Sequence, residues 1–410
     1  MSTQLEIVLK RRIRERGPIT FAEFMEIALY DRDHGYYAAG NRISEGGDFF
    51  TSPSAHPAFG ALLAVQLHEF WQHLGRPVPF VVVEPGAANG LLAADITGYA
   101  PRLDPEFAHA MSYKAFDIAP AADSVYPVQP LSDLPSGVTG CVVSNELLDA
   151  MPVHRFVIQD GGAVKELFVD VHGDDLVEVT GPPSTPLIEQ RLGSLPASLP
   201  NGYRGEVNPG IDRWADLVRS VLARGYVLTV DYGYDRPMLY APSRWAGTLR
   251  CYYRHTLGQD PMSNVGEQDI TTHVDFTALE EAMAGSGFES AGHAMQSEFL
   301  TNLGARELIR NLRRARLSQV EADTNRMAIL ELLKPEGMGN FRVVIHRRGV
   351  PALHITGLRG PADGVPRDEL PVPLISNSGR HISLFRGRYP EAARMAGTTW
   401  EDMFGVERYE

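Results

Sequence analysis

The sequence contains little cysteine, which limits both its chemistry and its compartment. Cys141 and Cys251 are the only cysteines among 410 residues, too few for a disulfide framework or a cysteine-based zinc site. His255 and His273 have no companion at metal-ligand spacing, so we expect no metal. Low cysteine content suits a reducing compartment, and the N-terminus lacks the apolar core of a secretory signal. The sequence therefore predicts a cytoplasmic protein.

Long apolar runs and excess positive charge are also missing. No apolar run approaches the roughly 20 residues needed to span a bilayer, so a membrane partner is not expected. The chain carries 38 basic and 51 acidic residues, a net charge of −13. Its basic run Lys10–Arg16 is typical of a helix surface, so nucleic acid is not expected as a partner either. The sequence does not decide whether the protein forms a homodimer.

The stretch from Phe80 to Tyr99 passes from a strand through a turn into a helix. Residues Phe80–Val83 are all apolar and mostly β-branched, as in a strand buried on both faces of a parallel sheet. Apolar residues then recur at helical spacing over Leu91–Tyr99. Gly86 and Gly90 in the turn would let a ligand approach the backbone and the helix N-terminus. The alternative is an ordinary turn in an unrelated α/β protein.

Acidic residues follow this strand and the next. Glu84 ends the first strand, and a carboxylate there suits a ligand with hydroxyls or an ammonium, such as S-adenosylmethionine (SAM), better than a bare pyrophosphate. Asp117 ends the second strand, Ser112–Ile118. A carboxylate at that position commonly accepts hydrogen bonds from ribose hydroxyls, although an exposed strand-end aspartate would look the same.

A third short strand opens the segment Gly140–Pro152 and ends in polar residues. Asn145, Glu146 and Asp149 follow it, and ligands of open α/β sheets bind at that edge. We therefore expect substrate chemistry there. Alternatively, the two carboxylates face solvent on a helical turn.

The remaining chain is predicted to cover and extend this frame. A period-two pattern from Arg155 to about Thr180 indicates an inserted β-meander, followed by an irregular loop over 182–205. The segments His34–His56 and Gly247–Asp275 are long enough to cover a site. The predicted parts are a helical N-terminal cap with its loop (1–75), an α/β domain (76–349) with the meander inserted at about 153–205, and a C-terminal extension (350–410).

Several motifs, taken in order, resemble the MidA-like family of class I SAM-dependent methyltransferases, which includes a mitochondrial arginine methyltransferase that assists complex I assembly. The matching stretches are HGYY (34–37), GDFFTSP (47–53), EPGAANG (84–90), SNELLDAMPVHRF (144–156), VDYGY (230–234), GTLRCYYRH (247–255), DITTHVDF (269–276) and MGNFRVV (338–344). The resemblance implies a Rossmann-like α/β fold with a seven-stranded sheet. It also implies SAM as cofactor and, as in characterised relatives, an arginine of a protein partner as acceptor.

Roles for individual residues follow from these motifs. Glu84 would order the turn that contains Gly86 and Gly90, and Asp117 would hold the ribose. The other expected cofactor-binding residues are Asp48, Thr51, Ser52 and Asn145. The methyl would pass by in-line displacement, with Glu146 and Asp149 holding a guanidinium and taking up its proton.

Some positions depart from the family pattern. Ala88 stands where glycine is usual in the turn, Ser54 stands where glutamate is favoured, and the tail beyond Gly349 is unmatched. Three functions therefore stay open: methylation of a protein arginine, methylation of N, O or S in a small molecule, and a non-catalytic assembly or binding module.

Overall fold

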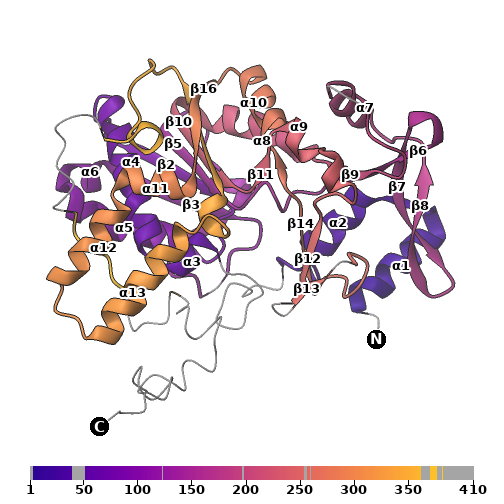
Figure 1. The fold of residues 1–410 in the computed structure, drawn as a ribbon, viewed down its shortest axis with the longest axis horizontal. Helices are drawn as coiled ribbons and strands as arrows, with labels where there is room; N and C mark the ends of the chain where they lie inside the picture. Colours follow the sequence, from indigo (N-terminus) through magenta and orange to yellow (C-terminus); the bar gives the residue numbers. More distant parts are fainter. Residues whose placement is uncertain are drawn as a thin grey trace, which may run out of the picture.

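A seven-stranded sheet forms the centre of the molecule in the computed structural model, which describes residues 3–38, 51–121, 123–195, 198–253, 256–258, 260–361, 370–375 and 381. The strand order is β16-β17-β10-β5-β2-β3-β4 (Figure 1). Every neighbouring pair is parallel except the two pairs that contain β17. The strands are β2 (Phe80–Pro85), β3 (Met111–Asp117), β4 (Val128–Pro130), β5 (Val138–Asn145), β10 (Leu222–Asp231), β16 (Glu289–Met295) and β17 (Arg342–Arg348). The predicted seven-stranded α/β fold is confirmed.

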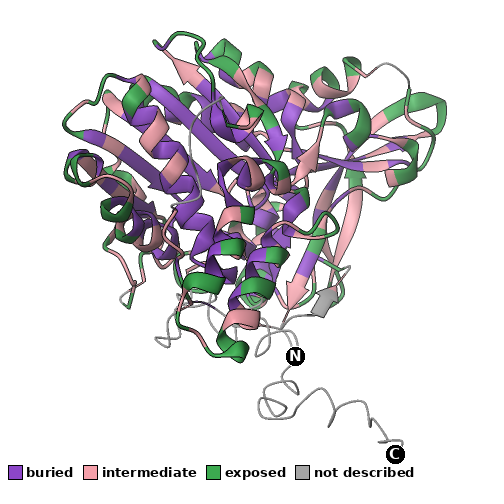
Figure 2. Cartoon of the chain, turned by 60° about the vertical axis from the view of Figure 1, so that its left-hand side comes forward, coloured by how far each residue is buried: buried purple, intermediate pink, exposed green. Residues whose placement is uncertain are grey.

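Helices cover both faces of this sheet, because successive residues of each buried strand point to opposite sides. Val82 packs in the apolar core on one face, and Val83 packs in the core on the other. The first face is covered by α4 (Ala58–His73), α5 (Leu91–Leu103), α11 (Gln296–Leu303), α12 (Ala305–Asn311) and α13 (Gln319–Leu332). The second is covered by α8 (Gly210–Val221) and α10 (Phe276–Gly285). Figure 2 shows the buried strands between these layers. The short helix α6 (Pro105–Ala110) precedes β3.

The inserted meander forms a second, antiparallel sheet beside the main one (Figure 1). Its strands are β6 (His154–Gln159), β7 (Ala163–His172), β8 (Asp175–Gly181) and β9 (Arg204–Val207). A strand of the N-terminal segment, β1 (Ile19–Thr20), pairs with β7, and α1 (Gln4–Arg16) and α2 (Phe21–Tyr30) flank it. The segment 182–205 is not wholly irregular as predicted, since it contains α7 (Pro186–Gly193), which Thr185 caps and Pro186 begins.

The segment Gly247–Asp275 is also more regular than its sequence indicates. It contains a three-stranded sheet of β12 (Arg250–Tyr253), β13 (Thr256–Gly258) and β14 (Asp269–Thr271). It then adds β15 (Val274–Asp275), which pairs with β11 (Gly233–Tyr234) before α9 (Arg236–Leu239). Strands of two to four residues are too short to show a periodic pattern, which explains why the sequence predicts a loop.

The described part of the C-terminal extension packs on the helices that cover the main sheet. It contains the short helix α14 (Thr356–Arg359). The Tyr99 hydroxyl donates to the Pro371 carbonyl at 2.8 Å, and His381 Nε2 lies 2.8 Å from Asp95 Oδ2. Both Tyr99 and Asp95 belong to α5, so the extension lies along that helix. Among the described residues, no helix has the length and apolar character needed to cross a membrane.

Candidate cofactor and acceptor site

The turn between β2 and α5 has an unusual backbone. Gly86, Ala88 and Gly90 all have positive φ, of 74°, 49° and 76°, a region that favours glycine. A Cβ atom at Gly86 would lie 2.7 Å from Leu147 Cδ1, and one at Gly90 would lie 2.8 Å from Tyr126 Cβ. Both glycines are therefore required by the fold of the turn, in addition to the ligand approach that the sequence suggests.

Two carboxylates at neighbouring strand ends support this turn. Asp117 Oδ2 accepts a hydrogen bond from the Ala88 N–H at 2.8 Å, and Oδ1 accepts one from Ala119 N–H at 3.1 Å. Glu84 is buried, and its Oε2 accepts from the Tyr113 hydroxyl at 2.9 Å. Burial raises the pKa of Glu84 to about 7, the nearby Asp117 charge adds to this rise, and the Tyr113 hydrogen bond opposes it. The predicted pair therefore meets at one edge of the sheet, directly under the turn.

Glu146 follows the end of β5 in a left-handed backbone conformation, with φ of 48°. Its N–H donates to the Val230 carbonyl at 2.9 Å, which fixes the residue beside β10. Its Oε1 accepts from Asn145 Nδ2 at 3.0 Å and from Ser52 N–H at 3.4 Å. Burial raises the pKa of Glu146 to about 8, and the neighbouring Asp149 carboxylate raises it further.

Asp149 is 4% exposed and accepts a short hydrogen bond from the Tyr232 hydroxyl through Oδ2. Its Oδ1 atom is buried and has no hydrogen-bond partner among the described residues. Burial raises the pKa of Asp149 to about 6. Asp231 lies beneath the same loop and accepts from the N–H groups of Leu147 and Leu148 at 3.2 and 2.9 Å. Asp149 is therefore buried and Glu146 is partly buried, so the two carboxylates do not lie exposed on a helical turn.

The N-terminal segment brings α3 (Ser52–Ala55) against this loop. Ser52 is buried, and its hydroxyl donates to Gln296 Oε1 at 3.1 Å in addition to the contact of its N–H with Glu146. The Thr51 N–H donates to Ser54 Oγ at 2.9 Å, so Ser54 caps this helix. Asp48 lies outside the described residues.

Sequence reasoning omits several side chains that the fold brings to this edge. The Tyr30 hydroxyl donates to the Ala150 carbonyl at 2.9 Å, and the Tyr37 hydroxyl donates to Asp269 Oδ1 at 2.9 Å. The sequence contains a signal for Asp231 and Tyr232, since they stand at the carboxyl end of β10, where the strand-end rule applies. It contains none for Tyr30 or Asp269, which reach the site only through tertiary packing.

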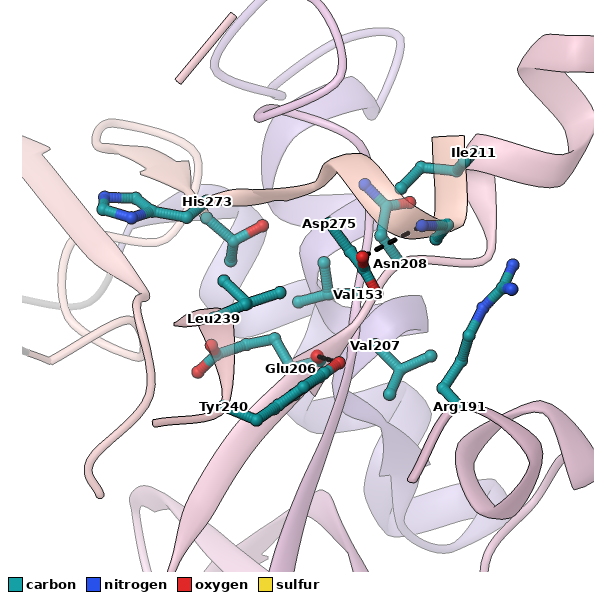
Figure 3. Close-up of a pocket in the computed structure, with 12 residues that line it drawn as sticks. Val153, Arg191, Glu206, Val207, Asn208, Ile211, Leu239, Tyr240, His273 and Asp275 are labelled. Carbon is teal, nitrogen blue, oxygen red and sulfur yellow. Dashed lines mark hydrogen bonds between the residues drawn. The ribbon is translucent and has the colours of Figure 1, made fainter. Parts of the chain in front are cut away.

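A crevice is lined by residues of the meander strand β9, of α9 and of the segment around β15 (Figure 3). It encloses about 290 Å³, including its open mouth. Glu206 in its wall accepts from the Thr248 N–H at 2.8 Å, and the Thr248 hydroxyl accepts from the His273 N–H at 3.1 Å. The Thr272 N–H then donates to the Asp149 carbonyl at 2.9 Å. These contacts connect the meander to the loop that presents Asp149. Burial lowers the pKa of His273 to about 4, so its ring is neutral at pH 7.

The residues at this edge fit a cofactor that combines hydroxyls with positive charge. Asp117 retains lone pairs for ribose hydroxyls, and the buried Asn145 Oδ1 has no partner among the described residues. Burial and the neighbouring Asp149 carboxylate both raise the pKa of Glu146 and of Asp231. A mostly parallel sheet with a polar site at the carboxyl ends of its strands is the architecture of Rossmann-like cofactor-binding enzymes.

The chain belongs to the family described as "Putative S-adenosyl-L-methionine-dependent methyltransferase", whose model matches residues 62–294. It is 30% identical over 337 residues to the mitochondrial protein arginine methyltransferase NDUFAF7 of Mus musculus, covering 72% of this chain and 73% of that protein. The homologue of Drosophila melanogaster is 26% identical, and the match covers 85% of each chain.

A solved structure agrees with this assignment. A COG1565 superfamily member from Burkholderia thailandensis, bound to S-adenosyl-homocysteine, is 29% identical, with a TM-score of 0.77. The match covers 88% of this chain and 95% of that one. The predicted family, the methyltransferase activity and SAM as cofactor are confirmed.

The prediction of a cytoplasmic protein is wrong on the same comparisons, because the curated relatives are named as mitochondrial proteins. Scarce cysteine indicates a reducing compartment, and a reducing environment is not unique to the cytoplasm. Cysteine content therefore could not support the more specific prediction.

Proposed function

We propose that this enzyme methylates an arginine side chain of a protein partner. The observation that carries the proposal is the group of three carboxylates, Glu146, Asp149 and Asp231, at the ends of β5 and β10. Burial raises the pKa of all three carboxyl groups, and the neighbouring Asp149 carboxylate adds to the rise for Glu146 and Asp231. A guanidinium would supply positive charge and matches carboxylates in geometry. The names of the relatives, protein arginine methyltransferases, support the same acceptor.

The cofactor would be held by residues of the first three strand ends. Asp117 would accept from the ribose hydroxyls, and Glu84 would order the turn around Gly86 and Gly90. Asn145 at the end of β5, Ser52 of α3 and the preceding Thr51 would complete the site, and Asp48 stays a predicted cofactor contact. When bound, SAM supplies a methyl group made electrophilic by a sulfonium.

The protein would contribute orientation and proton uptake. A guanidinium keeps its proton far above neutral pH, so it must lose one as it gains a methyl. The unpartnered Asp149 Oδ1 would accept one N–H and fix the orientation of the acceptor. Glu146 would take up the proton: a pKa of about 8 keeps it largely protonated in the empty site, and the charge of a bound guanidinium would lower that pKa, so that Glu146 ionises before it acts as the base.

We also propose that the predicted division of the chain has functional meaning. Residues 1–75 would cover the site, as the contact of Ser52 with Glu146 suggests. Residues 76–349 would form the transferase domain, with the meander at about 153–205 bracing its acceptor side. Residues 350–410 would form an extension, of which Pro371 and His381 contact α5.

Labelled SAM identifies the acceptor class directly. The enzyme is incubated with labelled SAM and cell extract, which is then separated by size. We expect label in a discrete protein band that survives base treatment, since methyl esters are cleaved by base and methylarginine is not. Label confined to small molecules would overturn the arginine proposal in favour of a metabolite acceptor, and no label in any fraction would favour a non-catalytic module.

A further inference from the structure

Three tyrosines and two buried carboxylates meet where α2, the end of β10 and β14 come together. They are Tyr30, Tyr37, Tyr232, Asp149 and Asp269, and we call them the tyrosine–carboxylate cluster. We propose that this cluster is the binding place of the acceptor's guanidinium. The proposal rests on the arginine methylation proposed above and adds the residues that would select the acceptor.

Contacts within the cluster connect its members into one unit. The Tyr30 and Tyr37 rings are stacked, with centroids 5.3 Å apart. The Tyr37 hydroxyl donates to Asp269 Oδ1 at 2.9 Å, and the Tyr232 hydroxyl donates to Asp149 Oδ2. The Tyr30 hydroxyl donates to the carbonyl of Ala150, the residue after Asp149. The tyrosines therefore fix both carboxylates and the backbone of the loop that follows β5.

The cluster is negatively charged and has an unused acceptor. Asp149 is 4% exposed and Asp269 is 3% exposed, and both raise the pKa of the Tyr30 and Tyr37 hydroxyls, as does burial of these rings. A buried carboxylate oxygen without a partner is costly. Asp149 Oδ1 is such an atom among the described residues, so this oxygen is where a charged donor would bind.

Guanidinium is the chemical group that satisfies these conditions together. It is planar and permanently charged, it presents five N–H donors, and it stacks on aromatic rings. The three tyrosines keep part of their surface accessible, whereas the two carboxylates are buried. A planar cation would therefore enter along the rings and place a donor on Asp149 Oδ1. A neutral amide or hydroxyl would leave the charge of Asp149 uncompensated.

Binding to the enzyme saturated with S-adenosyl-homocysteine tests this inference without turnover. The probes for calorimetry are N-acetyl-arginine methylamide and its citrulline counterpart, which has nearly the same shape but no charge. We expect the arginine compound to bind at least about tenfold more tightly, since hydrogen bonds to charged groups contribute about 1.5–3 kcal/mol. Equal binding, or no binding of either compound, would overturn the inference. Because no methyl is transferred here, this outcome is separate from failure of the labelling experiment.

Two variants then locate the binding place. Tyr37→Phe removes the hydroxyl that holds Asp269, and Tyr232→Phe removes the one that holds Asp149. Each should weaken binding of the arginine compound about three- to tenfold and leave S-adenosyl-homocysteine affinity unchanged, which also verifies folding. Tyr99→Phe is the matched control, because that hydroxyl contacts Pro371 on the outside of α5. If all three variants bind the arginine compound with the same affinity as the parent, the guanidinium binds outside the tyrosine–carboxylate cluster.

Discussion

Tyr232 donates its hydroxyl hydrogen bond to Asp149 Oδ2, while the preceding residue, Asp231, accepts from the backbone N–H groups of Leu147 and Leu148. Two consecutive residues at the end of β10 therefore hold the loop after β5. Tyr232 binds a side chain of that loop, and Asp231 binds its backbone. The consequence is chemical, because one oxygen of Asp149 is occupied and the other is left for a ligand.

Glu146→Gln tests the assignment of the proton acceptor. Glutamine can keep the contacts with Asn145 and Ser52 through its amide oxygen but cannot take up a proton. We expect turnover to fall at least about 100-fold, as for loss of a positioned general base, with affinity for S-adenosyl-homocysteine nearly intact. Single-turnover rates and calorimetry measure the two effects. Glu189→Gln, an exposed change on α7, is the control, and unchanged turnover in Glu146→Gln would remove Glu146 from the mechanism.

The same variant should alter how stability depends on pH. The pKa of Glu146 rises from 4.5 to about 8 on folding, so the folded state binds its proton more tightly than the unfolded state. Stability from this group is fully present below pH 4.5 and is lost as pH rises through about 8. In the absence of cofactor, the melting temperature of Glu146→Gln should therefore exceed that of the parent increasingly from pH 5 to pH 8.5. Parallel curves would mean that Glu146 ionises normally in the folded enzyme.

The sequence predicts the parts of this site that lie at strand ends. Glu84, Asp117 and Glu146 are found from a simple rule, because parallel strands bring their carboxyl ends to one edge. Tyr30 and Asp269 come from α2 and from the short strand β14, and only tertiary packing brings them to that edge. The strands of the segment Gly247–Asp275 cannot be predicted from the sequence either. They form because they pair with one another, and the sequence shows no alternating apolar pattern there.

Ala88 has a left-handed backbone conformation, and this predicts a stabilising substitution. An L-residue there costs roughly 1–2 kcal/mol, whereas glycine adopts positive φ freely but loses about 0.5–1 kcal/mol through unfolded-state entropy. Ala88→Gly should therefore raise the free energy of unfolding by about 0–1.5 kcal/mol in denaturant titrations. Ala94→Gly, within α5, is the opposite control and should lower it by about 0.5–1 kcal/mol. A clear loss of stability in Ala88→Gly would show that the methyl group packs favourably.

Asp117 should link the turn to cofactor affinity. Its Oδ2 accepts from the Ala88 N–H at 2.8 Å, and we propose that its remaining lone pairs accept from the ribose hydroxyls. Asp117→Ala removes both functions, so we expect affinity for S-adenosyl-homocysteine to fall about 10- to 100-fold, the equivalent of about 1.5–3 kcal/mol for hydrogen bonds to a charged group.

Asp117→Asn separates the two functions of this residue, because the amide oxygen can still accept from Ala88 while the charge is lost. If calorimetry gives Asp117→Asn an affinity between those of the parent and Asp117→Ala, the carboxylate charge contributes to cofactor binding in addition to the hydrogen bond that supports the turn. Asp133→Ala, an exposed change after β4, controls for the general effect of removing an acid from this region. If Asp117→Ala bound S-adenosyl-homocysteine as tightly as the parent, the ribose would have to be held by another residue.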